Sequence, residues 1–372
     1  MSRNSPYLSV IFNALDWIFA SNSRIWLLFF LPSWFLMWIT GNFLITRVRG
    51  LRGMNWSLFE KVPGSHPNHV EIPAMGGIGL VASAFLVHTG MVVSLVTLSA
   101  AVNGHVVVRQ ITEFPQFFLL QFCATLYAGS GMVGDWSKGA GRGGPSAYVK
   151  LATQYVFAWA FLVGLQITGE ISFLRGGRDP LSSLIVLSSV IVGTSNAVKL
   201  TDGIDGLVVG LTFEMGLVGL SLSHWLNLVR VSPPSPFEVP VLWACLGGSS
   251  LGFLTFNRHP ARVLLGDTGS LALGAALGAG AVALRAVFLL PFIGFIFFVE
   301  LFSVILQIAW FKFTRLRYGE GRRIFRRAPL HHHFELAGWS EWRVVVTFWG
   351  INAVTSLIGL TLWWRGDLPR FP

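Results

Sequence analysis

The chain has 372 residues, of which 53% are hydrophobic and only 12% are charged. A soluble globular domain carries roughly 25% charged residues, so this composition excludes an ordinary soluble protein and favours helices in a bilayer. The net charge of +10 does not indicate nucleic-acid binding, because the Lys and Arg residues lie in short loops between apolar runs. Cys123 and Cys245 lie inside apolar runs, where we expect small buried side chains rather than a disulfide or a metal site.

Apolar segments of about 20 residues, the length that crosses a bilayer, recur along the chain. The segment at 8–20 is predicted to be an interfacial helix, and 25–46 is too long for a signal peptide, so we expect it to be a retained first span. The prediction is an all-α polytopic transmembrane bundle of about ten spans, forming a single domain over residues 1–372. The expected spans are 25–46, 76–100, 115–133, 149–168, 181–198, 207–227, 239–256, 269–287, 289–311 and 344–364.

Basic residues set the expected orientation. They concentrate in the loops that follow the first, third and ninth spans, with eight of them between Lys312 and Arg343. By the positive-inside rule, odd-numbered spans then end in the cytoplasm and both termini face outward. Asp135 follows the third span, Asp202 and Asp205 follow the fifth, and Asp267 follows the seventh. Acidic groups beside membrane spans are functional candidates, so we expect a site on the cytoplasmic face.

Three of these acidic residues lie in two Gly-containing motifs. Asp202 and Asp205 are three residues apart, hence on one face of a helix, and Gly203 allows a ligand to approach closely. Two such carboxylates can hold a divalent cation or move a proton, although Asp before an apolar run is also a common helix cap. In LGDTGS at 265–270, Asp267 begins an apolar helix, which suits a metal–pyrophosphate group or, again, a cap.

Two further motifs carry basic residues. His331, His332 and His333 are adjacent, so they do not point the same way, and a three-His metal site is not expected. Among several Arg residues they suit phosphate contacts, and the alternative is a solvated basic loop. Asp135 and Lys138 end the third span before a Gly-rich loop, a pattern also typical of an ordinary charged helix end.

Several stretches resemble one enzyme family. They are PAMGG at 73–77, SNAVKLTDGIDGL at 195–207, FNRHPARVLLGDTGSLALGAALG at 256–278, VELFSVILQ at 299–307, FK at 311–312 and RIFRRAPLHHHFELAGWSEWRVVV at 323–346. The chain resembles the polyprenyl-phosphate N-acetylhexosamine-1-phosphate transferases, and the triple His favours their muramoyl-pentapeptide branch. The similarity covers about residue 73 to the C-terminus.

The resemblance implies a phosphoryl transfer at the bacterial inner membrane. Undecaprenyl phosphate would attack the β-phosphorus of UDP-N-acetylmuramoyl-pentapeptide, releasing UMP and forming lipid I for peptidoglycan. Mg²⁺ would be the cofactor, the bilayer the setting and a homodimer the expected assembly, with no nucleic-acid partner. The implied catalytic residues are Asp135, Asp202, Asp205, Asp267 and His331, with Asp267 and Asp202 at the metal. The implied substrate contacts are Lys138, Asn196, Lys199, Gly203, Leu264, Gln307, Ala328, His332 and His333.

The chain departs from that family at positions that touch substrate or chemistry. Two adjacent Asp residues are usual where this chain has Gly134 and Asp135, and Asn is usual at Lys199. Leu264 replaces a Phe expected to stack on uracil, and Ile72-Pro73-Ala74 replaces a Thr-Pro-Thr stretch. Three alternatives therefore stay open: a transferase for UDP-N-acetylglucosamine or another UDP-aminosugar, a catalytically silent scaffold, and a transporter or channel.

Overall fold

The computed structural model describes residues 26–50, 75–103, 115–139, 143–169, 180–229 and 238–369. Within these ranges every regular element is a helix, which confirms the all-α prediction. The helices are η1 (Trp26–Phe30, a π-helix), α3 (Leu31–Gly50), α4 (Gly77–Asn103), α6 (Pro115–Gly139), α7 (Ala147–Ile167), α8 (Pro180–Thr201), α9 (Leu207–Val229), α10 (Glu238–Asn257), α11 (Gly266–Ala283), η2 (Val287–Leu289, 3₁₀), α12 (Leu290–Ile293), α13 (Phe295–Tyr318), α14 (Leu330–Leu336) and α15 (Glu341–Arg365).

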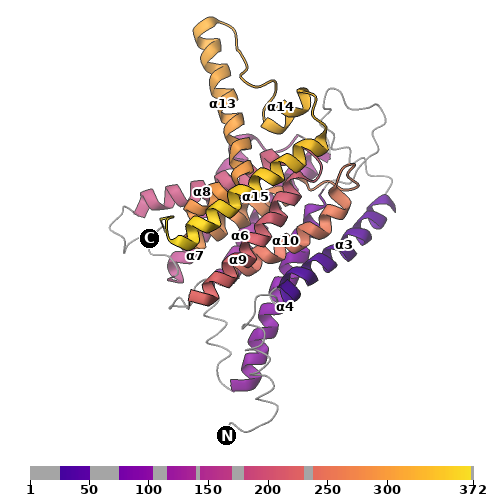
Figure 1. Cartoon of the computed structure of the whole chain (residues 1–372), viewed down its shortest axis with the longest axis vertical. Helices are drawn as coiled ribbons and strands as arrows, with labels where there is room; N and C mark the ends of the chain where they lie inside the picture. Colours follow the sequence, from indigo (N-terminus) through magenta and orange to yellow (C-terminus); the bar gives the residue numbers. More distant parts are fainter. Residues whose placement is uncertain are drawn as a thin grey trace.

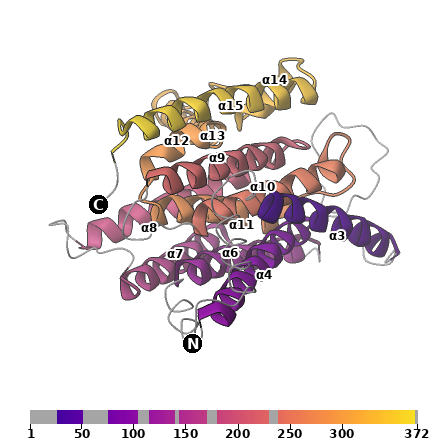
Figure 2. The same cartoon turned by 60° about the horizontal axis from the view of Figure 1, so that its bottom comes forward.

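Helix α11 forms the centre of the bundle. It packs on α6 and α8, and it also contacts α4, while α10 packs against α9 and α3 (Figure 2). Helices α14 and α15 lie over α9 and α12 on the opposite side from α4 and α7. Every residue from Thr268 to Ala283 is buried. The C-terminal ends of α6 and α8 meet the N-terminal end of α11, since Lys138 and Lys199 both lie beside Asp267.

Small residues permit this close packing. A Cβ placed on Gly274 of α11 would lie 2.6 Å from the Ser195 Cα in α8. A Cβ placed on Gly131 of α6 would lie 2.3 Å from the Asp267 carbonyl oxygen. Helices in a membrane associate through such backbone contacts, since lipid offers no hydrophobic gain between two apolar surfaces. The glycines thus set how near α6 and α8 come to the first turn of α11.

Seven of the described helices are long and apolar enough to cross a membrane: Gly77–Ser94, Phe117–Lys138, Ala147–Ile167, Pro180–Thr201, Val239–Asn257, Phe295–Tyr318 and Glu341–Arg365. Two shorter apolar helices, Leu28–Phe43 and Leu207–Leu222, lie at other expected spans. A polytopic helical membrane protein is thereby supported, while the number of about ten spans stays a prediction. The expected helix at 8–20 lies outside the described residues, as does Ile72-Pro73-Ala74. Cys123 and Cys245 are free and buried, as expected.

The chain between 283 and 295 differs from the expected pattern of two simple spans. Helix α11 ends at Ala283, and Arg285 has a φ of 56°, which stops the helix. Short helices η2 and α12 follow, and α13 then runs to Tyr318, seven residues beyond the expected end. Figure 1 shows α13 extending away from the rest of the bundle. Hydropathy marks apolar length, but it does not report such a break inside an apolar run.

Candidate active site

The carboxylate of Asp135, near the end of α6, holds the first turn of α11. Its Oδ1 accepts a hydrogen bond from the Asp267 backbone N at 3.1 Å. Its Oδ2 accepts from the Thr268 backbone N at 2.9 Å and from Thr268 Oγ1 at 2.8 Å. These amides have no partner inside α11, so Asp135 caps that helix although it comes from another one. The cap fixes Asp267 next to the end of α6.

Three lysine ammonium groups surround the Asp267 carboxylate. Its Oδ2 lies 2.8 Å from Lys199 Nζ, 3.2 Å from Lys138 Nζ and 3.8 Å from Lys150 Nζ. The three lysines come from α8, α6 and α7, and the Asp267 side chain is only 12% exposed. Asp267 and the neighbouring Asp135 provide two carboxylates against three ammonium groups. The cluster of Lys138, Lys150, Lys199 and Asp267, here called the lysine cluster, therefore carries positive charge that suits a phosphate or pyrophosphate.

Asp202 lies in the turn between α8 and α9, beside the lysine cluster. Burial and the neighbouring carboxylates of Asp267, Asp135 and Asp205 raise the pKa of Asp202 to about 8. Without a cation, Asp202 is therefore mostly protonated at neutral pH. The structure thus brings together Asp135, Asp202 and Asp267, which are far apart in sequence.

His331 lies against the next residue of that turn. Its side chain is fully buried, and a Cβ placed on Gly203 would lie 2.2 Å from its Nε2. Glu300 of α13 holds the imidazole, with Nδ1 3.2 Å from Oε1, and it also accepts the Leu330 and His331 backbone N–H groups at the start of α14. A carboxylate only accepts hydrogen bonds, so Nδ1 donates. Nε2 is buried against Gly203 and has no hydrogen-bond partner among the described residues.

The other predicted contacts on this side hold the loop between α13 and α14. His332 Nδ1 lies 2.7 Å from Glu335 Oε2, and His333 Nδ1 accepts from the Arg326 backbone N at 3.1 Å. Gln307 Oε1 accepts from the Ile324 and Phe325 backbone N–H groups at 3.1 and 3.0 Å. Ala328, which precedes Pro329 through a cis peptide bond, lies in the same loop. In the described structure Gln307 therefore holds the loop that carries the basic residues.

Two of the predicted substrate contacts also hold the walls of the site. The Asn196 side-chain amide donates to Gln154 Oε1 of α7 and to the Val192 carbonyl oxygen, so it ties α8 to α7. The Leu264 carbonyl oxygen accepts from the Gly76 backbone N at 2.9 Å, and its side chain is half-buried. The substrate contacts of both residues stay predictions.

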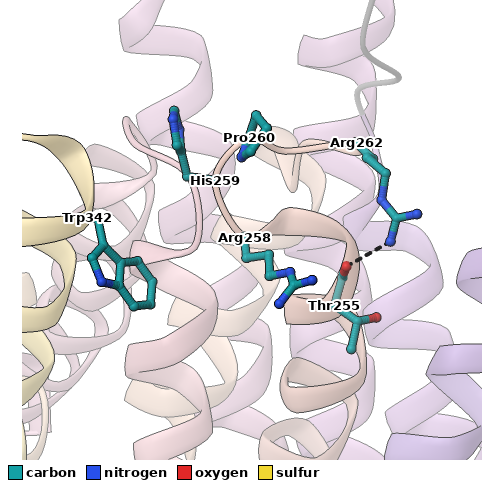
Figure 3. Close-up of a pocket in the computed structure, with 6 residues that line it drawn as sticks. All are labelled: Thr255, Arg258, His259, Pro260, Arg262 and Trp342. Carbon is teal, nitrogen blue, oxygen red and sulfur yellow. Dashed lines mark hydrogen bonds between the residues drawn. The ribbon is translucent and has the colours of Figure 1, made fainter.

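Asp205 faces a second group of residues. Its Oδ2 accepts from the Ala261 backbone N at 2.9 Å and lies 3.3 Å from His259 Nδ1, which is 2.8 Å from Glu341 Oε2. Asp205, His259 and Glu341 offer ligand atoms within 4.8 Å of one another. His259 also lines a pocket of about 650 Å³, together with Thr255, Arg258, Pro260, Arg262 and Trp342 (Figure 3). The Asp205 side chain therefore contacts Ala261 and His259, while its charge still acts on Asp202 beside the lysine cluster.

Comparison with known proteins decides the family. A family model described as glycosyl transferase family 4 matches residues 117–285. The phospho-N-acetylmuramoyl-pentapeptide-transferase of Shouchella clausii (strain KSM-K16) is 36% identical over 312 residues, covering 82% of this chain and 87% of the relative. That of Bacillus pumilus (strain SAFR-032) is 37% identical over 317 residues, with 82% and 87% coverage. The chain belongs to the phospho-N-acetylmuramoyl-pentapeptide-transferase family.

Enzymes of this transferase family are generally dependent on a divalent metal, and the carboxylates of this site are candidate ligands. Mg²⁺ in phosphoryl-transfer sites takes one or two carboxylates together with substrate phosphates. Asp267 and Asp202 provide such oxygens at the convergence of α8 and α11. The set therefore fits an ion that arrives together with phosphates, even though three lysines now contact Asp267.

Sequence reasoning missed several residues of this family member's site. Lys150 contacts Asp267, but it follows a loop in sequence and carries no motif of its own. His259 and Glu341 join Asp205 from distant elements, which no spacing could indicate. Glu300 could have been found, because an acidic residue inside the apolar run VELFSVILQ is a functional candidate by itself.

Proposed function

We propose that this chain transfers phospho-N-acetylmuramoyl-pentapeptide from its UDP conjugate to undecaprenyl phosphate. The products are UMP and lipid I, a precursor for peptidoglycan. The observation that carries this proposal is the identity of 36% with a transferase of that name over 82% of the chain. The lysine cluster supports it, since three ammonium groups on one partly buried carboxylate suit a pyrophosphate substrate.

The described residues have distinct roles in this reaction. Lys138, Lys150 and Lys199 bind the pyrophosphate and stabilise the charge that develops on the leaving UMP. Asp135 keeps Asp267 in place and orients the attacking lipid phosphate. Asp267 and Asp202 would hold Mg²⁺, which, when bound, offsets charge on the bridging phosphates.

The remaining proposed contacts surround this centre. The proposal assigns His331 to the nucleotide or sugar side. Its buried, unpartnered Nε2 lies against Gly203, so the turn at Gly203 would have to shift for a direct contact. The proposal assigns supporting contacts to Asp205, Asn196, Leu264, Gln307, Ala328, His332 and His333. The site faces the cytoplasm in the bacterial inner membrane, and a homodimer stays a prediction.

Release of UMP tests the proposal directly. Purified protein is incubated with Mg²⁺ and undecaprenyl phosphate, with UDP-N-acetylmuramoyl-pentapeptide and UDP-N-acetylglucosamine offered separately. We expect UMP from the pentapeptide substrate alone and at least a 100-fold loss in Asp267→Ala, since one electrostatic contact to the transition state contributes about 10²–10³ in rate. UMP from the other sugar assigns the protein to the sister reaction.

Gly134 favours one second candidate, a silent scaffold, because a carboxylate usual in the family is missing there. No UMP from either sugar, with the protein shown to be folded, supports that candidate. Gly134→Asp then distinguishes a weakened enzyme, which regains turnover, from a scaffold, which does not. Gly134→Asn is the matched control, since it adds the same volume without the charge.

A further inference from the structure

The lysine cluster holds Asp267 in a state that resists a divalent cation. Its Oδ2 is 2.8 Å from Lys199 Nζ, and the Lys199 and Asp267 side chains are 25% and 12% exposed. Charges that are mostly shielded from water interact more strongly than surface charges, because solvent screens them less. A divalent cation that approaches Asp267 therefore meets repulsion from Lys199, Lys138 and Lys150.

Two departures of this chain from its relatives' pattern strengthen that contact. Lys199 stands where the resembling family usually has Asn, and it forms the shortest of the three ion pairs to Asp267. Gly134 provides no second carboxylate. A Cβ at Gly134 would lie 3.3 Å from both Asp267 Oδ2 and Lys150 Nζ, so a side chain there would point between them. In the described structure Lys150 Nζ instead lies 3.8 Å from Asp267 Oδ2, as an ion pair.

The diphosphate of a nucleotide changes this balance. Its oxygens carry more negative charge than one carboxylate, and lysine ammonium groups bind phosphate readily as mobile point charges. Bound next to the cluster, the diphosphate attracts the lysines away from Asp267 and adds phosphate oxygens as metal ligands. The carboxylate and the phosphates then together offer a site that the protein alone does not.

We propose that Lys199 acts as a built-in counter-ion that keeps Asp267 from binding a divalent cation until a nucleoside diphosphate is present. Metal and nucleotide then bind with strong positive coupling, and the protein without nucleotide binds metal weakly. The inference rests on the proposed function, because it assigns the nucleotide diphosphate to the lysine cluster. The inference concerns the binding of metal and nucleotide, which can be measured without turnover.

The test is a titration of the purified full chain with Mn²⁺ as the probe, followed by the electron paramagnetic resonance signal of free Mn²⁺. Wild type, Lys199→Asn and Lys199→Met are each titrated without and with saturating UDP. In wild type we expect UDP to tighten Mn²⁺ binding by about tenfold or more. Without UDP, both Lys199 variants are expected to bind Mn²⁺ about tenfold tighter than wild type, with a smaller further gain from UDP.

The matched control is Lys312→Asn, which removes one exposed lysine from α13 outside the cluster. Its Mn²⁺ affinity should equal that of wild type. Equal affinities without UDP in wild type and both Lys199 variants would overturn the inference. Thermal unfolding shows which variants are folded. If Lys199→Asn does not fold, Lys199→Met provides the same test with a side chain of similar length. If the protein releases no UMP but its Mn²⁺ affinity still depends on Lys199, the proposed reaction is wrong and the inference about Lys199 stands.

Discussion

Asp202 lies where its surroundings disfavour the ionised carboxylate. It lies in a turn outside the helices, near three other carboxylates, and its pKa of about 8 compares with an ordinary value of 3.8. A protonated carboxyl group resembles an amide in size and hydrogen bonding, so the resting site tolerates it without a counter-ion. A bound cation would favour the ionised form.

Asp202→Asn therefore has a predicted pH dependence. Between about pH 4 and pH 8, the Asp202 carboxyl is protonated in the folded wild type but ionised in the unfolded chain. Wild type thus loses stability as the pH rises from about 4 to about 8, whereas Asn does not titrate. In buffer without divalent cations, the melting temperature of the variant minus that of wild type should grow between pH 5 and pH 8 and level off above. Parallel profiles would contradict the prediction.

At the scale of single residues, sequence reasoning found the charged positions but not their partners. Asp267 and Lys199 were both singled out, and they form the shortest ion pair of the lysine cluster. The substrate contact of Gln307 stays a prediction, and its side chain accepts hydrogen bonds from the loop backbone at Ile324 and Phe325. A motif identifies residue types, while a partner depends on how distant segments pack, which one sequence does not encode locally.

Among the helices, α11 determines where the chemistry can take place. Its first turn is capped by Asp135 from α6, and its glycines admit α8. The expected span at 269–287 located most of it, because its Gly- and Ala-rich stretch is apolar. The cap and the break before α12 were missed, since they depend on contacts and on one left-handed residue, Arg285.

Gly131→Ala tests the packing of α6 on α11. Its Cβ would lie 2.3 Å from the Asp267 carbonyl oxygen, a backbone atom that cannot rotate away. We expect a loss of about 1–3 kcal/mol in the free energy of unfolding and a fall in UMP release, because Asp267 must shift. Thermal unfolding and the UMP assay measure the two effects.

Gly129→Ala is the control on the same helix, since a Cβ there meets nothing within 4 Å. Alanine favours a helix over glycine, by up to about 1 kcal/mol, so this variant should be as stable as wild type or more so. Similar losses in both variants would show that α6 does not approach α11 as described.

Over the whole molecule, the ends of helices separate into two faces. The lysine cluster and the loop between α13 and α14 share one face, and the far end of α7 at Thr168 lies at the other end of a candidate span. Basic residues in the first group set the expected cytoplasmic side. Cys123 and Cys245 are buried, so an introduced cysteine can report its side with little background.

Arg323→Cys and Thr168→Cys test this orientation, because both native side chains are exposed. A maleimide that cannot cross membranes should label Arg323→Cys in inverted inner-membrane vesicles and Thr168→Cys in right-side-out vesicles. The opposite pattern would reverse the topology. Labelling after detergent solubilisation confirms that each cysteine is reactive.

The capping of α11 by Asp135 bears on how mutants of this protein will be interpreted. A strain with a change at Asp135 loses a contact between two helices together with any role the carboxylate has toward substrate. Its phenotype is therefore not a measure of proton transfer. Suppressor mutations that restore growth should map to the first turn of α11, around Thr268, if the lost cap is what limits the cell. Because Asp135 and Thr268 are joined by two hydrogen bonds, a change at either residue should disturb the same contact between α6 and α11.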